Sequence, residues 1–172
     1  MPINKLVKQG DCFDSLNTPD SLIVHGCNAQ GAFGRGFAGQ VRAKNPEALF
    51  AYLHAYHNGG LMLGEIYHAK VPHKDNVWLL NGITQEFYGG DRKLYVSYDA
   101  IQKVMRNVRE FCRVHRIQNI NMPKIGADLG GGDWKIIEKI IDEELGVDAW
   151  GNPSNSSSLP VDFTYTIWEW KP

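Results

Sequence analysis

Residues 25–39 have the sequence HGCNAQGAFGRGFAG and connect a predicted strand to a predicted helix. The strand, residues 21–25, is apolar at its centre, which is typical of a strand covered on both faces. Residues 37–56 have helical periodicity, and Pro46 marks a break or a new start. Glycines let a backbone turn sharply and approach a ligand, and a helix N-terminus presents free N–H groups to an anion. This stretch therefore predicts an anion-binding loop within an α/β fold.

Residues 124–134, KIGADLGGGDW, repeat this arrangement of strand, glycine-rich loop and helix. The strand is predicted over 118–123 and the helix over 134–145. Open α/β sheets usually bind ligands at the carboxyl ends of their strands, so the two loops together predict a diphosphate site. Glycines that only form tight turns are the alternative, which two loops in equivalent settings make weaker than one loop would. The first loop lacks the Gly-Lys-Ser/Thr ending of a P-loop.

The rest of the chain also alternates between strand and helix patterns. Residues 6–10 are predicted as a short strand and 161–170 as a final aromatic strand. Residues 65–69 and 77–81 bracket a turn-rich segment and are predicted as two strands joined by a hairpin or short loop. Residues 98–115 have the periodicity of a helix. This order predicts a layered α/β fold with helices on both faces of the sheet.

Two of the predicted helices are amphipathic. The inward face of the helix over 134–145 is predicted to carry Ile136, Ile137, Ile140 and Ile141. Opposite the apolar face of the helix over 98–115, arginines recur at helical spacing: Arg106, Arg109, Arg113 and Arg116. A basic surface for nucleic acid is one interpretation, but a solvated helix face is favoured.

The composition is that of an ordinary globular protein, with 43% hydrophobic and 22% charged residues in a chain of 172. This length fits one domain with a full core. A formal net charge of -1 predicts no partnership with nucleic acid or membrane, so phosphate binding must be local. The three cysteines have no C-x-x-C spacing and suggest neither disulfides nor zinc. The N-terminus lacks the apolar core of a signal peptide, so we expect a cytoplasmic protein. We also expect a monomer that has no metal and no cofactor.

The two glycine-rich loops and several shorter segments resemble the macro domain family, and the resemblance covers nearly the whole length of the chain. The matching segments are, in chain order, 10–11, 25–28, 34–38, 46–48, 81–84, 122–126, Trp134 and 166–168. Within the family, the likeness is greatest to the branch that contains ADP-ribose 1''-phosphate phosphatases. The resemblance implies an α/β fold, a three-layer α/β/α sandwich with a mixed central sheet, in which residues 1–172 form a single macro domain.

The resemblance also implies a partner, ADP-ribose or ADP-ribose 1''-phosphate. Asp11 would accept a hydrogen bond from the adenine amino group and Trp168 would lie near the adenine, with a turn residue and a core tryptophan as the alternatives. Asn28 would face the distal ribose. The implied ligand-binding residues are Asp11, Cys12, Asn28, Gly31, Gly34, Arg35, Gly36, Phe37, Thr84, Ile125, Gly126, Ala127, Leu129, Gly130, Gly131 and Trp168.

His25 and Asp128 are the candidate catalytic residues. His25 ends a strand just before the ligand loop, where a pKa near neutrality permits acid–base chemistry, and the phosphatase branch has a histidine at this position. A hydrogen-bonded structural histidine is the alternative. The Asp128 carboxylate lies in a phosphate loop, which is unfavourable unless it reacts, points away or pairs with Lys124 or Arg35. We hypothesise that Asp128 and His25 together position or activate a water at the terminal phosphate.

A related branch of the family removes ADP-ribose from glutamate with a lysine after an Ile-Thr pair and an aspartate in the second loop. Here Gln85 follows the pair Ile83-Thr84, and Gly130 stands where that aspartate would fall. An amine is therefore absent from its expected place, which counts against this route. Phosphate hydrolysis from ADP-ribose 1''-phosphate is the leading prediction. Removal of ADP-ribose from modified macromolecules and a non-catalytic ADP-ribose-binding module are the alternatives.

Overall fold

The computed structural model describes residues 1–91 and 93–170 and contains a six-stranded sheet in the order β1-β6-β5-β2-β4-β3. The strands are β1 (Lys5–Gln9), β2 (Ser21–Asn28), β3 (Ile66–Lys70), β4 (Val77–Gln85), β5 (Asn119–Met122) and β6 (Thr164–Glu169). Neighbouring strands are parallel except for β3, which pairs antiparallel with β4. The expected hairpin over 65–81 is thus the antiparallel part of a mixed sheet.

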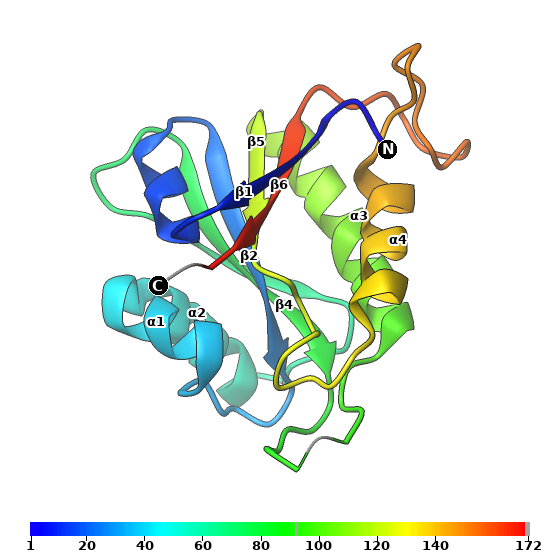
Figure 1. Ribbon diagram of the computed structural model, residues 1–172. Coiled ribbons are helices and arrows are strands. Elements are labelled where there is room, and N and C mark those ends of the chain that lie inside the picture. The colour runs from blue at the N-terminus through cyan, green and yellow to red at the C-terminus, as the bar shows by residue number, and fades with distance from the viewer. Residues whose placement is uncertain (92, 171–172) are drawn as a thin grey trace.

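Helices cover both faces of this sheet (Figure 1). They are the 3-10 helix η1 (Cys12–Asn17) and the α-helices α1 (Gly36–Lys44), α2 (Pro46–His57), α3 (Tyr98–His115) and α4 (Trp134–Leu145). The helices α1 and α2 pack on one face, and α3 and α4 pack on the other. Pro46 is the first residue of α2, where its fixed φ suits the first turn, so it separates two helices as expected. The predicted three-layer α/β/α sandwich is confirmed.

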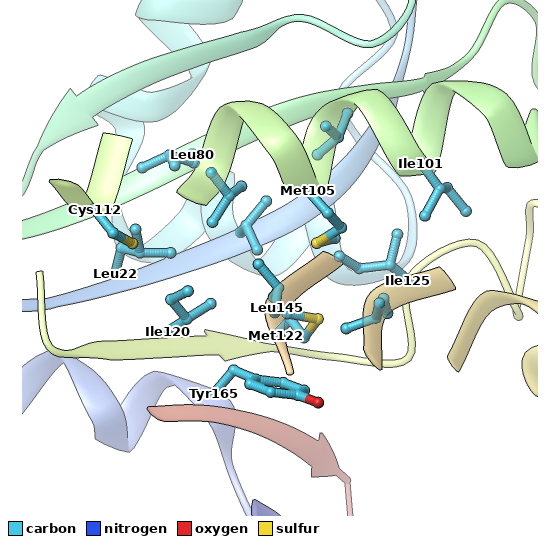
Figure 2. Close-up of a cluster of buried hydrophobic side chains, with 14 of the residues drawn as sticks. Leu22, Leu80, Ile101, Met105, Cys112, Ile120, Met122, Ile125, Leu145 and Tyr165 are labelled. Carbon is cyan, nitrogen blue, oxygen red and sulfur yellow. The ribbon is translucent and has the colours of Figure 1, made fainter. Parts of the chain in front are cut away.

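The central strand β2 supplies side chains to the core on each side of the sheet. Leu22 and Val24 belong to the core under α3 and α4, whereas Ile23 belongs to the core under α1 and α2. Figure 2 shows Leu22 in the first of these cores, together with Met105 from α3 and Ile120 from β5. Burial on both faces explains why this strand has an unbroken apolar centre instead of alternation.

The structure corrects the predicted inward face of α4 at one residue. Ile137 and Ile141 are fully buried and Ile140 packs against the core, but Ile136 is 44% exposed. The buried stripe follows the spacing of three and four residues onward to Leu145, and Ile136 lies about 100° around the helix from Ile137.

The predicted solvated arginine face of α3 is wrong at one position. Arg106, Arg113 and Arg116 are exposed, but the side chain of Arg109 is only 17% exposed. Its guanidinium donates to the backbone carbonyl of Glu144 and lies 3.4 Å from a carboxylate oxygen of the same residue. The sequence pattern missed this pair because it depends on α4 packing against α3.

The short helix η1 was not predicted. It follows Gly10 and is capped by Asp11, whose Oδ1 accepts a hydrogen bond from the Phe13 N–H at 2.9 Å. Periodicity cannot detect a helix of this length, although an aspartate is a preferred N-cap residue.

The carboxyl ends of β2 and β5 lie at the same edge of the sheet because the two strands are parallel and adjacent. Both glycine-rich loops leave from this edge, and both lie in the lower half of the view in Figure 1. The connection from α4 to β6 lies at the opposite, upper end. Over the described residues, no helix combines the length and apolar character needed to cross a membrane.

Candidate ligand-binding and active site

A cavity of about 640 Å³ lies where the two glycine-rich loops approach each other. This volume suits a small organic ligand, and its place at the strand ends is the usual one in α/β sheets. The sequence-predicted residues that line it are His25, Asn28, Gly34, Arg35, Gly36, Phe37, Thr84, Ile125, Gly126, Asp128, Leu129, Gly130 and Trp168. Both candidate catalytic residues and most candidate ligand residues are therefore brought to one cavity.

The remaining predicted ligand residues do not line this cavity: Asp11, Cys12, Gly31, Ala127 and Gly131. Gly31 has a φ of +81°, and a Cβ added there would lie 2.8 Å from the ring of Tyr56. Gly131 packs against the carbonyl of Lys93. These two glycines allow the loops to pack against their neighbours, which is the tight-turn alternative at those positions.

The first loop ends at a helix N-terminus that has no side-chain cap. Arg35 precedes α1 in an extended conformation, and its side chain makes no capping hydrogen bond. Within the described residues, the N–H groups of Gly36, Phe37 and Ala38 have no acceptor. All three residues line the cavity. Free N–H groups at the positive end of a helix dipole favour an anion at this place.

The second loop presents N–H groups of its own rather than those of the helix that follows. Asp133 caps α4, because its Oδ1 accepts a hydrogen bond from the Lys135 N–H at 2.9 Å. Gly126, Leu129 and Gly130 line the cavity, and their N–H groups find no acceptor among the described residues. The cavity therefore has free backbone donors on two sides.

Most hydrogen-bonding capacity of the Asn28 side chain is used within the first loop. Its Oδ1 accepts from the N–H of Gln30 at 2.9 Å, the N–H of Ala32 at 3.3 Å and the hydroxyl of Tyr52 at 3.0 Å. Its Nδ2 donates to the carbonyl of Ala32 at 2.7 Å. One N–H of the amide is left without a partner among the described residues.

His25 is buried, with 1% of its surface exposed, and packs against the rings of Phe33 and Phe37. Its Nε2 lies 2.7 Å from Oδ1 of Asn81, whose Nδ2 donates to the carbonyl of Ala48 at 2.9 Å. Burial lowers the pKa of His25 to about 4, although the hydrogen bond to Asn81 acts in the opposite direction. The imidazole is therefore neutral at pH 7. The sequence predicted a pKa near neutrality for His25, and burial places the pKa well below that value.

A buried hydroxyl in the cavity lining has no hydrogen-bond partner among the described residues. It is Oγ1 of Thr84, at the end of β4. A Cβ added to Gly26 would lie 2.7 Å from this oxygen, so glycine is required beside it. A buried unsatisfied hydroxyl costs free energy, and a bound molecule or water would remove that cost.

Trp168 marks the end of the cavity next to β1. Its indole Nε1 donates to Oδ1 of Asn121 at 2.9 Å, which fixes the ring. A Cβ added to Gly10 would lie 3.5 Å from the ring, so the backbone at Gly10 lies close to the indole. Asp11 is the next residue along the chain. Oδ1 of Asp11 is engaged by Phe13, which leaves Oδ2 as an acceptor.

Asp128 is exposed in the second loop and is not neutralised by its expected partners. Lys124 pairs with Glu169 at 3.3 Å and lies over the ring of Trp134. In the part of the chain that the structure describes, no ion pair links Asp128 to Lys124 or Arg35. The carboxylate is therefore available to a ligand or a water in the cavity.

The two positions that differ from the glutamate-specific branch are neighbours in space. Gln85 turns its Nε2 back to the carbonyl of Phe87 at 2.7 Å. Its Oε1 would lie 3.1 Å from a Cβ added to Gly130, and the same Cβ would lie 2.8 Å from the carbonyl oxygen of Gly126. Position 85 therefore carries an amide in place of the lysine, and position 130 carries no side chain in place of the aspartate.

Several lining residues were not identified from the sequence, among them Gln40, Gln85, Tyr88, Glu169 and Trp170. Gln40 lies one helical turn after the start of α1, so helical spacing was a usable signal. Tyr88 lies in an irregular segment after β4, where no local pattern predicts its place.

The fold and the site define a class of protein: an α/β protein with an anion-binding cavity between two glycine-rich loops. The macro domain family model matches residues 24–141, which is more than half of the chain, so the chain belongs to the macro domain family.

Several curated relatives have names that concern ADP-ribose, and two of them come from Thermus aquaticus and Candida albicans. The DNA ADP-ribosyl glycohydrolase of Thermus aquaticus is 24% identical over 85% of this chain, and the alignment covers 42% of that protein. The ADP-ribose 1''-phosphate phosphatase of Candida albicans is 25% identical, over 71% of this chain and 80% of that protein. The chain thus spans less than half the length of the Thermus relative. These relatives are distant hydrolases.

Solved structures agree with the fold. A Bacteroides thetaiotaomicron protein of unknown function is 26% identical with a TM-score of 0.78, over 95% of this chain and 96% of that one. Thermosipho africanus DarTG, solved in complex with ADP-ribose, is 18% identical with a TM-score of 0.71. That match covers 96% of this chain and 42% of the other, and at this identity it supports the fold alone.

Proposed function

We propose that this macro domain binds ADP-ribose derivatives and hydrolyses ADP-ribose 1''-phosphate to ADP-ribose and phosphate. The observation that carries this proposal is the pair of free N–H sets, at Gly36, Phe37 and Ala38 on one side of the cavity and at Gly126, Leu129 and Gly130 on the other. Backbone donors on two sides suit a diphosphate, which has acceptor oxygens on both faces.

The two ends of the cavity suit the two ends of the ligand. The fixed indole of Trp168 offers a flat surface to an adenine. Asp11 lies outside the cavity lining, but it follows Gly10 beside this ring, and its free Oδ2 is an acceptor for the adenine amino group. The remaining N–H of Asn28 and the unpartnered hydroxyl of Thr84 offer donors to the distal ribose. The terminal phosphate then lies near the second loop and Asp128.

The proposed reaction needs a water, a base and charge stabilisation. The carboxylate of Asp128 accepts a proton from the water as the water oxygen bonds to phosphorus. The bond between phosphorus and the oxygen on C1'' breaks. That oxygen takes up a proton from solvent to give the hydroxyl of ADP-ribose, and Asp128 returns the proton that it accepted to solvent. Free N–H groups of the loops stabilise the charge on the phosphoryl oxygens. His25 does not exchange a proton in this reaction, because it is neutral and its Nε2 proton is held by Asn81. It acts as a positioning residue that packs against Phe37 of the first loop.

The burial of His25 also supports a second candidate, a module that binds ADP-ribose without turnover. A histidine that is buried, neutral and hydrogen-bonded is the structural alternative for this residue. If His25 is only structural, Asp128 is the one candidate catalytic residue that is left among the two that the sequence indicated. Removal of ADP-ribose from macromolecules by a lysine is disfavoured, because Gln85 and Gly130 occupy the two positions that this route requires.

The test measures phosphate release from ADP-ribose 1''-phosphate together with calorimetric binding of ADP-ribose. We expect release by the wild type and a loss of at least about 100-fold in kcat for Asp128→Asn, with binding changed by less than about threefold. Asp75→Asn is the matched control, since Asp75 is exposed in the turn before β4, away from the cavity. Binding without release by the wild type would establish the module instead. If ADP-ribose does not bind, the ligand assignment is wrong.

A further inference from the structure

A second cavity, of about 520 Å³, lies between the end of α3 and residues 157–163. None of the residues that line it lines the first cavity. The segment that covers it belongs to the long connection from α4 to β6, at the opposite end of the sheet from the glycine-rich loops (Figure 1). Long connections with little regular structure are uncommon in domains, and they are usually either functional loops or linkers.

The rim of this second cavity carries the four arginines of α3 and its C-cap: Arg106, Arg109, Arg113 and Arg116. Arg106 and Arg109 share a single carboxylate, that of Glu144, and Arg113 pairs with Glu110. No ion pair of Arg116 occurs within the described ranges, 1–91 and 93–170. With Asp162 as the other acidic residue of the lining, positive charge is in excess here, although the chain as a whole has a net charge of -1.

The second cavity has an apolar floor, and the covering segment adds one polar atom that has no partner among the described residues. Cys112, Ile117 and Phe163 are buried there, and Leu159 lies on the covering segment. Oγ of Ser158 is buried and has no hydrogen-bond partner among the described residues. A buried hydroxyl of this kind is unfavourable in the free protein and gains a partner when a ligand with acceptor oxygens binds.

We propose that this second cavity is a binding site for a small organic anion, with an apolar or aromatic body and one phosphate or carboxylate group. The guanidinium groups of Arg109 and Arg116 bind the anionic group, because planar forks of donors match both phosphate and carboxylate. Ser158 donates to a further oxygen of that group. The body of the ligand packs on Ile117 and Phe163, and the volume of the cavity suits a molecule of that size.

This site is independent of the ADP-ribose site and of the proposed reaction. It is tested with phenylphosphonate, an aromatic dianion that has no ester bond to hydrolyse. Amide shifts in the ¹H–¹⁵N NMR spectrum are followed for residues 112–118 and 157–163. We expect saturable shifts there, and binding of inorganic phosphate weaker by at least about threefold because it has no body to pack on the floor. Benzoate, with the same ring and a carboxylate, shows which anionic group is preferred.

Three variants decide between a built site and a general charge effect. Arg116→Gln is expected to weaken phenylphosphonate binding by about fivefold or more, a typical loss for one charge-assisted contact. The matched control Lys139→Gln removes the same charge from an exposed position on α4 and is expected to change binding by less than about twofold. Ser158→Ala is expected to weaken binding without lowering the stability of the free protein, because the lost hydroxyl has no partner there.

The proposal is overturned by any of four results, of which three concern phenylphosphonate binding by the wild type and its variants. These are the absence of saturable shifts at residues 112–118 and 157–163, equal losses in Arg116→Gln and Lys139→Gln, or equal binding of inorganic phosphate and phenylphosphonate. Saturable shifts in a 12-base-pair DNA duplex titration with none for phenylphosphonate would also overturn it, in favour of a nucleic-acid surface.

Discussion

The side chains of Asn81 and His25 form a hydrogen bond whose direction is fixed, with Oδ1 of Asn81 2.7 Å from Nε2 of His25. The carbonyl of Ala48 can only accept, so the NH₂ of Asn81 must face it, at 2.9 Å. Oδ1 of Asn81 therefore faces His25, and Nε2 of the imidazole must carry the proton. The residue at the start of the ligand loop is thus held in one tautomer.

The first prediction concerns stability at acidic pH. The pKa of His25 is about 4 in the folded protein, below its ordinary value of 6.5. Between these values the unfolded chain binds more protons, so this contribution to stability is complete above pH 6.5 and is lost as the pH falls toward 4. The loss attributable to His25 is about 3 kcal/mol. Urea unfolding of the wild type and of His25→Gln between pH 7 and pH 4 measures it.

Only the difference between the two proteins is used, because other groups also titrate over this range. The free energy of unfolding of the wild type should fall more steeply on acidification than that of His25→Gln. NMR of the His25 ring nitrogens provides a second measurement, and should show the Nε2-protonated neutral form at pH 7. An imidazole that titrates near pH 6.5 would contradict the assignment.

The second prediction concerns the contact between Gly26 and Thr84. In Gly26→Ala, the new Cβ lies 2.7 Å from Oγ1 of Thr84 and 3.2 Å from Cγ2 of Ile125, so overpacking is expected to lower stability by about 1–3 kcal/mol. Thr84→Ala removes the oxygen that is contacted. The double variant should therefore be less destabilised than the sum of the single ones, as measured by a double-mutant cycle in urea. Additive effects would show that the two residues do not touch.

The fold followed closely from the sequence because its signals are local. The bounds of α3 and α4 agree with their periodicity, and the apolar centre of β2 indicated a strand covered on both faces. The prediction failed at Arg109 because a neighbouring helix decides the burial of that side chain. Arg109 is half-buried because α4 presents Glu144 to it, and no pattern within α3 contains that information.

The site was only partly predictable for the same reason. The glycine-rich loops identified the cavity, but the state of each donor depends on partners that are distant in sequence. His25 is neutral because of burial and contacts Asn81, 56 residues later, and Asn28 is occupied by Tyr52 and its own loop. The two loops also differ in helix capping. The side chain of Asp133 caps α4, whereas the side chain of Arg35 does not cap α1.

The third prediction concerns Gly130, which stands where the glutamate-specific branch has an aspartate. Gly130→Asp is expected to lower stability by about 1–3 kcal/mol, because its Cβ would lie 2.8 Å from the carbonyl oxygen of Gly126. Gln85→Lys is expected to fold normally, since Gln85 is only half-buried, but to release no ADP-ribose from a modified glutamate peptide. Thermal unfolding and a peptide assay measure the two effects. Release by Gln85→Lys alone would show that the second-loop carboxylate is not needed.

The fourth prediction separates helix stability from ligand affinity at the start of α1. Arg35 occupies the N-cap position in an extended conformation without capping, so a serine there would accept a hydrogen bond from Phe37 or Ala38. Compared with Arg35→Ala, which loses the same guanidinium, Arg35→Ser should be more stable by about 1 kcal/mol. Because its hydroxyl occupies an N–H that we assign to the ligand phosphate, Arg35→Ser should also bind ADP-ribose about threefold more weakly. Thermal unfolding and calorimetry on the two variants measure both quantities. If stability rises and affinity does not fall, the free N–H groups of α1 are not the phosphate donors.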